Sequence, residues 1–258
     1  MRYILRPLQV LYSIYAILVF LALMLILLPF VLVAGAFRET TRGDIIYYIV
    51  TFWSDAGMLL WGMPHKTMGL KDYDPSHPVI FVFNHGSYLD IPILLKSVRR
   101  FRVRVLGKAE MAKIPLFGLF YRGAVIMVDR SSADARSKSV SKLKTSLNKN
   151  ISVVIAPEGT FNMTHKPLKD FYDGAFRIAI ETQTPIKPMI LLDAFDRLHP
   201  GSICSFTPGR SRTVFLDEIS VKGYDTENVS ELKRVVYQAM ETALIKFEAS
   251  WIKDNHAN

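Results

Sequence analysis

The feature that most constrains this chain is a stretch without any charged residue, which runs from Pro7 to Phe37. A helix rises about 1.5 Å per residue, so roughly 20 apolar residues cross a hydrocarbon core of about 30 Å. The stretch therefore predicts a transmembrane helix over about residues 8–37. A cleaved signal peptide is the alternative, because Arg2 and Arg6 precede the stretch and Ala34-Gly35-Ala36 has the small residues of a cleavage site. Signal peptides usually have an apolar core about half as long, which favours an anchor.

A second apolar stretch, over about residues 45–63, differs in kind. Asp55 interrupts it, and a charge at mid-membrane costs roughly 2.5–3.5 kcal/mol. The stretch also carries aromatic residues that favour the headgroup level of a bilayer, Tyr47, Tyr48, Trp53 and Trp61. We therefore expect an interfacial helix. Together the two stretches indicate a membrane anchor over residues 1–64 and one folded domain over residues 65–258.

The charge of the chain is concentrated in that domain. The net charge is +9, whereas residues 1–63 hold four basic and three acidic side chains. Beside a membrane anchor, an anionic lipid surface or a phosphate-bearing substrate is the simplest partner for the excess. Nucleic acid is not expected, since no aromatic-basic recognition motif is present. With the single cysteine Cys204 no intrachain disulfide can form, which suits a domain facing the cytoplasm from the inner or plasma membrane. Charge alone does not fix the topology, because basic residues lie on both sides of the first stretch.

The domain alternates between short β-branched runs and longer helical periodicities, which is typical of an α/β fold. The predicted strands cover residues 79–83, 101–105, 124–128, 151–156, 186–192 and 213–219. Helices are predicted over about 87–98, around residues 140–147, over 174–182 and after Thr226.

A histidine and a carboxylate follow the first of these strands, in the segment Asn84-His85-Gly86-Ser87-Tyr88-Leu89-Asp90. A carboxylate bonded to one ring nitrogen of His85 would fix the tautomer and leave the other nitrogen to take a proton from a hydroxyl. The alternative is structural, because Ser87 and Asp90 also form a helix-capping box. No Gly-x-Ser-x-Gly sequence is present, so direct base-assisted transfer is favoured over an acyl-enzyme.

Two further strands also end in candidate binding residues. One ends in Asp129-Arg130, and another in Pro157-Glu158-Gly159-Thr160. Ligands of open α/β sheets bind at the carboxyl ends of strands, so these segments are expected at the same crevice as His85. Arg130 could hold a phosphate, and Gly159 allows a ligand to approach the backbone closely. In isolation, Asp129-Arg130 is equally well explained as a surface ion pair, and the segment from Pro157 to Thr160 as a tight turn.

In this fixed order, the segments resemble the lysophospholipid (glycerolipid) acyltransferase family, as in bacterial 1-acylglycerol-3-phosphate acyltransferases. The segment from Asn84 to Asp90 resembles the first family motif, and the segment from Ala124 to Arg130 resembles the second. Pro157 to Thr160 resembles the third, and Pro185-Ile186-Lys187-Pro188 the fourth. Lys108-x-Glu110 also looks like a family segment. The resemblance covers about residues 65–220 and implies an α/β domain with a mixed sheet flanked by helices.

The resemblance implies a His85/Asp90 dyad in which His85 deprotonates the acceptor hydroxyl for attack on an acyl-CoA or acyl carrier protein thioester. The implied acceptor is the sn-2 hydroxyl of 1-acylglycerol-3-phosphate, a lysophospholipid, and the product is phosphatidic acid. Substrate binding is assigned by the same resemblance to Lys108, Arg130, Glu158, Gly159 and Thr160. No cofactor or metal is implied, because no ligand cluster of suitable spacing exists.

The chain departs from the family pattern in the third motif. Phosphatidic-acid-forming members usually have an arginine where Phe161 follows Thr160 here, and Asp173 replaces a lysine before Gly-Ala-Phe. Either another cation supplies the missing charge, for which the candidates are Lys108, Lys166 and Lys169, or the acceptor is a different lyso-lipid, such as a lyso-amino-acid lipid. A non-catalytic scaffold that holds anionic lipid is the third alternative, although a scaffold needs neither His85 nor Asp90.

Overall fold

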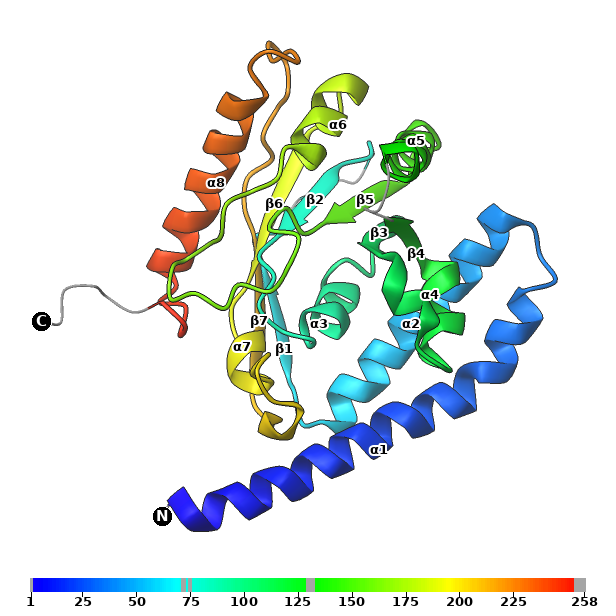
Figure 1. Cartoon of the computed structure of the whole chain (residues 1–258), viewed down its shortest axis with the longest axis vertical. Helices are drawn as coiled ribbons and strands as arrows, with labels where there is room; N and C mark the ends of the chain where they lie inside the picture. The colour runs from blue at the N-terminus through cyan, green and yellow to red at the C-terminus, as the bar shows by residue number, and fades with distance from the viewer. Residues whose placement is uncertain (1, 71–72, 74–75, 129–132, 253–258) are drawn as a thin grey trace, which may run out of the picture.

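A computed structural model describes residues 2–70, 73, 76–128 and 133–252 of the chain. The chain begins with two long antiparallel helices, α1 (Arg2–Ala34) and α2 (Glu39–Leu60), which pack on one another along one side of the molecule (Figure 1). The remaining described residues form a seven-stranded sheet with helices on both faces.

The sheet is mixed and has the strand order β1-β7-β6-β2-β5-β3-β4. Neighbouring strands are parallel except for the antiparallel pair β6 and β7. The strands are β1 (His65–Met68), β2 (Ile80–Phe83), β3 (Val103–Lys108), β4 (Val125–Val128), β5 (Ser152–Ile155), β6 (Ile186–Leu191) and β7 (Ser211–Phe215). The α/β fold with a mixed sheet flanked by helices, predicted from the sequence, is confirmed.

Alternating strand residues divide the interior into two cores. In β2, Phe81 and Phe83 point into the core shared with α1 to α4, whereas Ile80 and Val82 point into the core shared with α5, α6 and α8. All four residues are buried, because helices cover both faces of the sheet. A strand covered on both faces needs apolar side chains at every position, which explains the continuous apolar run of β2. The helices are α3 (Asp90–Ser97), α4 (Phe117–Ala124), α5 (Ala133–Asn148), α6 (Gly174–Thr182), α7 (Ala194–Arg197) and α8 (Val229–Lys246), with short 3-10 helices η1 (Ala109–Lys113) and η2 (Ile203–Ser205).

The sequence did not predict α4 or β1. The segment that forms α4 has eight residues, which is shorter than the window over which a helical period can be read from a sequence. Strand β1 is short and polar and lies at the sheet edge, where only β7 pairs with it. Its pairing partner lies far along the sequence, so the local residue pattern does little to indicate a strand here.

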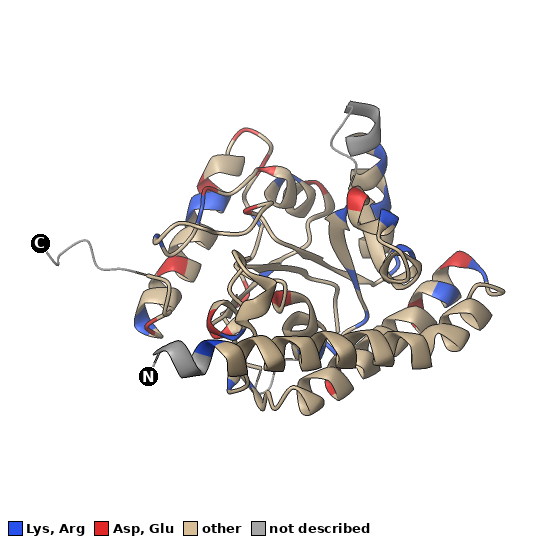
Figure 2. Cartoon of the chain, turned by 60° about the horizontal axis from the view of Figure 1, so that its bottom comes forward, with Lys and Arg blue, Asp and Glu red and all other residues tan. Residues whose placement is uncertain are grey.

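Helix α1 is fastened to the rest of the chain near its amino-terminal end and at its middle. Trp61 links it to the end of α2, because the Tyr12 hydroxyl donates to the Trp61 carbonyl (2.6 Å) and the Trp61 indole donates to the Ala16 carbonyl (3.1 Å). The Gln9 amide donates to the Ser205 carbonyl at 3.0 Å. The segment Arg6–Ala34 is long and apolar enough to cross a membrane. Figure 2 shows that the outward side of α1 is nearly free of charged residues.

Candidate active site

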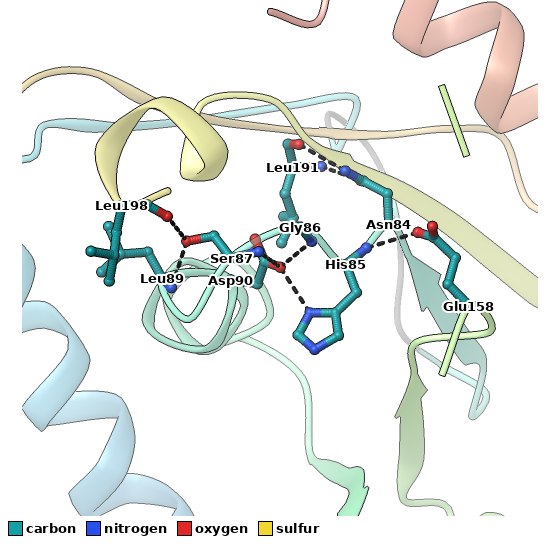
Figure 3. A network of polar contacts seen from close by, with 9 residues as sticks. All are labelled: Asn84, His85, Gly86, Ser87, Leu89, Asp90, Glu158, Leu191 and Leu198. Atoms are coloured by element: carbon teal, nitrogen blue, oxygen red, sulfur yellow. Dashed lines mark hydrogen bonds and ion pairs between the residues drawn. The ribbon is translucent and has the colours of Figure 1, made fainter. Parts of the chain in front are cut away.

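The site lies where strands β2 and β5 end. These strands are parallel neighbours, so the residues that follow them emerge at the same edge of the sheet. His85 follows β2, and Glu158 follows β5. The sequence prediction that these two segments face one crevice is confirmed by a hydrogen bond of 2.9 Å from the His85 backbone N–H to Glu158 Oε1 (Figure 3).

His85 and Asp90 form the expected pair. His85 Nδ1 lies 2.8 Å from Asp90 Oδ2, and Asp90 is buried, with 1% of its surface exposed. The same oxygen accepts the backbone N–H groups of Gly86 (2.7 Å) and Ser87 (2.8 Å). A carboxylate oxygen in this position accepts a hydrogen bond from the imidazole when the ring proton is on Nδ1, and that tautomer leaves Nε2 without a proton. The side chain of His85 is 21% exposed, and its Nε2 has no hydrogen-bond partner within the described residues, so Nε2 is available as a base.

The same turn also has the capping character that the sequence suggested as an alternative. Ser87 Oγ accepts the Leu89 backbone N–H at 3.1 Å and donates to the Leu198 carbonyl at 2.6 Å. Asp90 accepts the Ser87 N–H in return. The structural and the chemical interpretations therefore do not compete, because the bonds that shape the turn also place the carboxylate against the imidazole.

Asn84 fixes the histidine loop to the neighbouring strand β6. Its side-chain amide donates to the Leu191 carbonyl (3.0 Å) and its Oδ1 accepts the Leu191 N–H (2.8 Å). The side chain is buried and replaces a backbone pairing at the point where β2 ends. In the sequence, Asn84 begins the segment that resembles the first family motif, but no role follows from that position. A buried asparagine just after a strand was the available signal.

Glu158 bridges two segments of the site. Its Oε1 accepts the His85 N–H, and its Oε2 accepts the Lys169 N–H at 2.9 Å. Only 1% of the residue is exposed, and this burial raises the pKa of Glu158 to about 7, although the two N–H donors oppose the shift. Both oxygens thus face backbone donors of the protein. The direct role in substrate binding expected from the sequence stays a prediction.

The other predicted binding residues have different surroundings. Lys108, Gly159 and Thr160 line the same cavity as His85. Gly159 has φ +69°, a left-handed conformation that suits glycine. Arg130 lies outside the described residues.

Phe161 lies directly against the imidazole of His85. Its ring centroid lies 4.5 Å from that of His85 and 4.8 Å from that of Tyr88, and both contacts are edge-to-face. A third ring, that of Phe83, lies 5.7 Å from His85 on the strand side. The imidazole is therefore surrounded by aromatic side chains, while Asp90 supplies the only charge bonded to it within the described residues.

A cavity of about 320 Å³ opens beside His85 and is lined mainly by apolar side chains. Its wall is formed by the two amino-terminal helices and by the sheet domain. Met24 of α1 and Val50 and Trp53 of α2 face residues of β3 and α4, such as Val105 and Phe120. No sequence pattern indicates that α1 and α2 reach the site, because these contacts join residues far apart in the chain. Within the described residues, no group of three or more His, Cys, Asp or Glu side chains could hold a metal ion.

Comparison with known proteins agrees with this geometry. Residues 66–192, which contain the histidine loop and the Glu158 loop, match the family model described as acyltransferase. The chain belongs to this acyltransferase family. It is 27% identical over 209 residues to a 1-acyl-sn-glycerol-3-phosphate acyltransferase of Haemophilus influenzae. The aligned region covers 80% of this chain and 85% of the relative. A bovine 1-acyl-sn-glycerol-3-phosphate acyltransferase alpha is 30% identical over 71% of this chain and 63% of its own length.

A solved structure supports the fold over nearly the whole chain. The crystal structure of a 1-acyl-sn-glycerophosphate acyltransferase from Thermotoga maritima superposes with a TM-score of 0.75, covering 98% of this chain and all of that one. The sequence identity is 21%, so this likeness establishes the fold. The two long amino-terminal helices fall within the superposed part, since almost all of the chain is covered.

Proposed function

We propose that this acyltransferase moves a fatty acyl group from acyl-CoA or acyl carrier protein to the sn-2 hydroxyl of 1-acylglycerol-3-phosphate, giving phosphatidic acid. The observation that carries the proposal is the His85–Asp90 pair at an apolar cavity. The cavity accounts for an acyl chain, and His85 Nε2, which has no hydrogen-bond partner within the described residues, accounts for the activation of a hydroxyl. The relatives named 1-acylglycerol-3-phosphate acyltransferases favour this acceptor.

The reaction follows from the orientation of the imidazole. His85 Nε2 takes the proton of the acceptor hydroxyl as its oxygen attacks the thioester carbonyl, and Asp90 stabilises the imidazolium that forms. When the tetrahedral intermediate collapses, the carbon–sulfur bond breaks and the thiol leaves with the proton from Nε2. The new ester bond and the free thiol balance the reaction. Backbone N–H groups near Gly159 are proposed to stabilise the oxyanion.

The charge that an acceptor phosphate needs is best supplied by Lys169. Its Nζ lies 2.6 Å from Thr160 Oγ1, and Thr160 lines the cavity with His85. Lys169 is half-buried and forms no ion pair within the described part of the chain. Lys108 also lines the cavity, whereas the Lys166 side chain is exposed and has no described contact. We therefore rank Lys169 first among the three lysines considered. Arg130 stays a predicted phosphate ligand.

One observation favours a second acceptor. Phe161 covers one side of His85 with an apolar ring, at the position where phosphatidic-acid-forming members usually have an arginine. An acceptor with less phosphate chemistry, such as a lyso-amino-acid lipid, would fit this surface with fewer cationic contacts. The transfer step and the role of His85 would be the same for both acceptors.

We further propose that α1 and α2 lie in the interface of a single membrane leaflet. Helix α1 is hydrogen-bonded to the domain and to α2 at Gln9, Tyr12 and Ala16, so those contacts would have to break before it could cross a bilayer alone. Its outward side is apolar, with Leu18 and Ile26 at least 60% exposed. A helix with one face bound to protein and the other apolar suits shallow insertion.

The test is acyl transfer by purified protein in liposomes or detergent. Lysophosphatidic acid and a lyso-amino-acid lipid are offered separately, each with acyl-CoA and with acyl carrier protein. The His85→Ala variant tests the base, and the His77→Ala variant is the matched control, because His77 bonds to Glu218 and does not line the cavity. Phosphatidic acid that depends on His85 supports the leading proposal, and product from the other acceptor alone supports the second. No transfer to either would return the chain to the scaffold alternative.

A further inference from the structure

A second cavity, separate from the catalytic one, lies between α2 and the turn that joins α3 to β3. Its volume is about 220 Å³, and none of its lining residues lines the cavity beside His85. It is lined by Asp44, Tyr47, Tyr48, Arg99, Arg100, Phe101 and Arg102. Three arginines against one carboxylate make it an anion site by composition.

The cations around this cavity exceed the carboxylates that could neutralise them. Asp55 pairs with Lys96 and Arg99, each at 2.8 Å. Asp44 pairs with Arg102 (2.6 Å) and Arg104 (2.7 Å).

Arg100 is the fifth cation of the group. It is exposed and forms no ion pair within the described residues. Five basic side chains therefore share two carboxylates, and the guanidinium of Arg100 is open to an external anion.

The cavity lies at the edge of an apolar strip. Tyr48, Phe52 and Leu59 project from α2 with exposed fractions of 71%, 61% and 79%. They lie on the side of the helix away from Tyr47 and Ser54, which bond to the carbonyls of Val98 and Pro92 in the α3 region. Tyr48 belongs both to this strip and to the cavity lining. An exposed tyrosine between an apolar surface and arginines is typical of the depth at which lipid headgroups lie.

We propose that this cavity binds the phosphate of an anionic phospholipid in the leaflet on which the enzyme sits. Arg100 and Arg99 would supply charge-assisted hydrogen bonds to the phosphate, and Tyr48 and Phe52 would insert beside the lipid glycerol and upper acyl region. The site would fix how the protein lies on the membrane. It does not take part in the chemistry at His85, and so it stands or falls independently of the proposed acceptor.

The test is vesicle co-sedimentation of the full chain. Wild type is compared with Arg99→Gln/Arg100→Gln on vesicles of phosphatidylcholine alone and of phosphatidylcholine with phosphatidylglycerol. Each basic residue near an anionic membrane changes binding by about 1 kcal/mol, so the double variant is expected to bind the anionic vesicles roughly 30-fold more weakly. Binding to the neutral vesicles should be unchanged.

A charge-matched control is Lys142→Gln/Lys149→Gln. Both lysines are exposed on or next to α5, which covers the opposite face of the sheet (Figure 1). This variant should bind anionic vesicles as wild type does. Acyl transfer in neutral detergent micelles should be equal for all three proteins, which shows that the variants are folded.

Three results would overturn the proposal. The first is anionic-vesicle binding by Arg99→Gln/Arg100→Gln at the wild-type level. The second is an equal loss in the Lys142→Gln/Lys149→Gln control, which would mean general charge attraction. The third is an equal loss of binding by the double variant to the vesicles of phosphatidylcholine alone, which would mean that the two arginines do not distinguish anionic from neutral lipid.

Discussion

Replacing Lys169 by alanine tests where the acceptor charge is recognised. The Lys169 ammonium is held against Thr160 at 2.6 Å, beside the cavity that contains His85. A hydrogen bond to a charged group contributes about 1.5–3 kcal/mol. Because Lys169 is half-buried and water screens it in part, we take the lower limit, about 1.5 kcal/mol, which corresponds to roughly a tenfold fall in kcat/KM.

The assay compares two acceptors that share the reacting hydroxyl. One is 1-acylglycerol-3-phosphate, and the other is the monoacylglycerol that lacks the phosphate. In Lys169→Ala, KM for the phosphate-bearing acceptor should rise about tenfold with kcat nearly unchanged, because the contact is made in both the ground and transition states. The rate with monoacylglycerol should stay the same, and Lys169→Arg should retain most of the discrimination.

Lys166→Ala is the matched control, since Lys166 lies in the same loop and is exposed. It should leave both acceptors unaffected. An equal slowing of both acceptors in Lys169→Ala would contradict a role in binding the phosphate, because Lys169 would then only position Thr160. An unchanged KM for the phosphate-bearing acceptor would refute it as well and would return the phosphate to Lys108 or Arg130.

Three further predictions concern the site and its cavity. Asp90→Asn should lower kcat by about 10²–10⁴ through loss of the charge that stabilises the imidazolium, whereas Asp90→Ala should also lower the thermal midpoint, since two backbone N–H groups lose their acceptor. For Glu158, burial raises the pKa from 4.5 to about 7, so the folded state keeps a proton that the unfolded chain releases, and stability should fall as pH rises between these values by roughly 3 kcal/mol at most. Thermal unfolding at about pH 5 and pH 8 checks this, and a Glu158→Gln variant with the same slope would contradict it. Ala124→Leu should narrow the cavity and lower kcat/KM most for the longest acyl donors, and an unaltered chain-length preference in a donor competition would show that the acyl chain lies elsewhere.

The sequence predicted the site where local pattern and sheet geometry decide it. Helix α6 was predicted over residues 174–182, and these are its bounds in the structure. The loops after β2 and β5 meet because parallel neighbouring strands present their carboxyl ends at one edge of the sheet. The pairing of His85 with Asp90 also follows locally, since both belong to one turn.

Contacts between distant segments were beyond the sequence. The Glu158 carboxylate was expected to face substrate, yet its oxygens accept N–H groups of His85 and Lys169, and spacing alone does not reveal such a bridge. Likewise, an apolar helix that crosses a membrane and one that lies along a protein have the same composition. The partners of α1, such as Trp61 and Ser205, favour the second arrangement, and these partners lie far along the chain.

The contacts of α1 and α2 with the cavity bear on how an acyl chain would enter. Met24, Val50 and Trp53 form part of the cavity wall, so the same two helices have one side against the cavity and another that is exposed and apolar. Moving an acyl chain of about 16 carbons through water would cost on the order of 12 kcal/mol, at about 0.8 kcal/mol for each CH₂ group. If α1 and α2 lie in the leaflet as proposed, most of that cost is avoided, because the acyl chain passes from lipid to an apolar lining. Under the proposed function, α1 and α2 are therefore part of the acyl site as well as the means of attachment to the membrane.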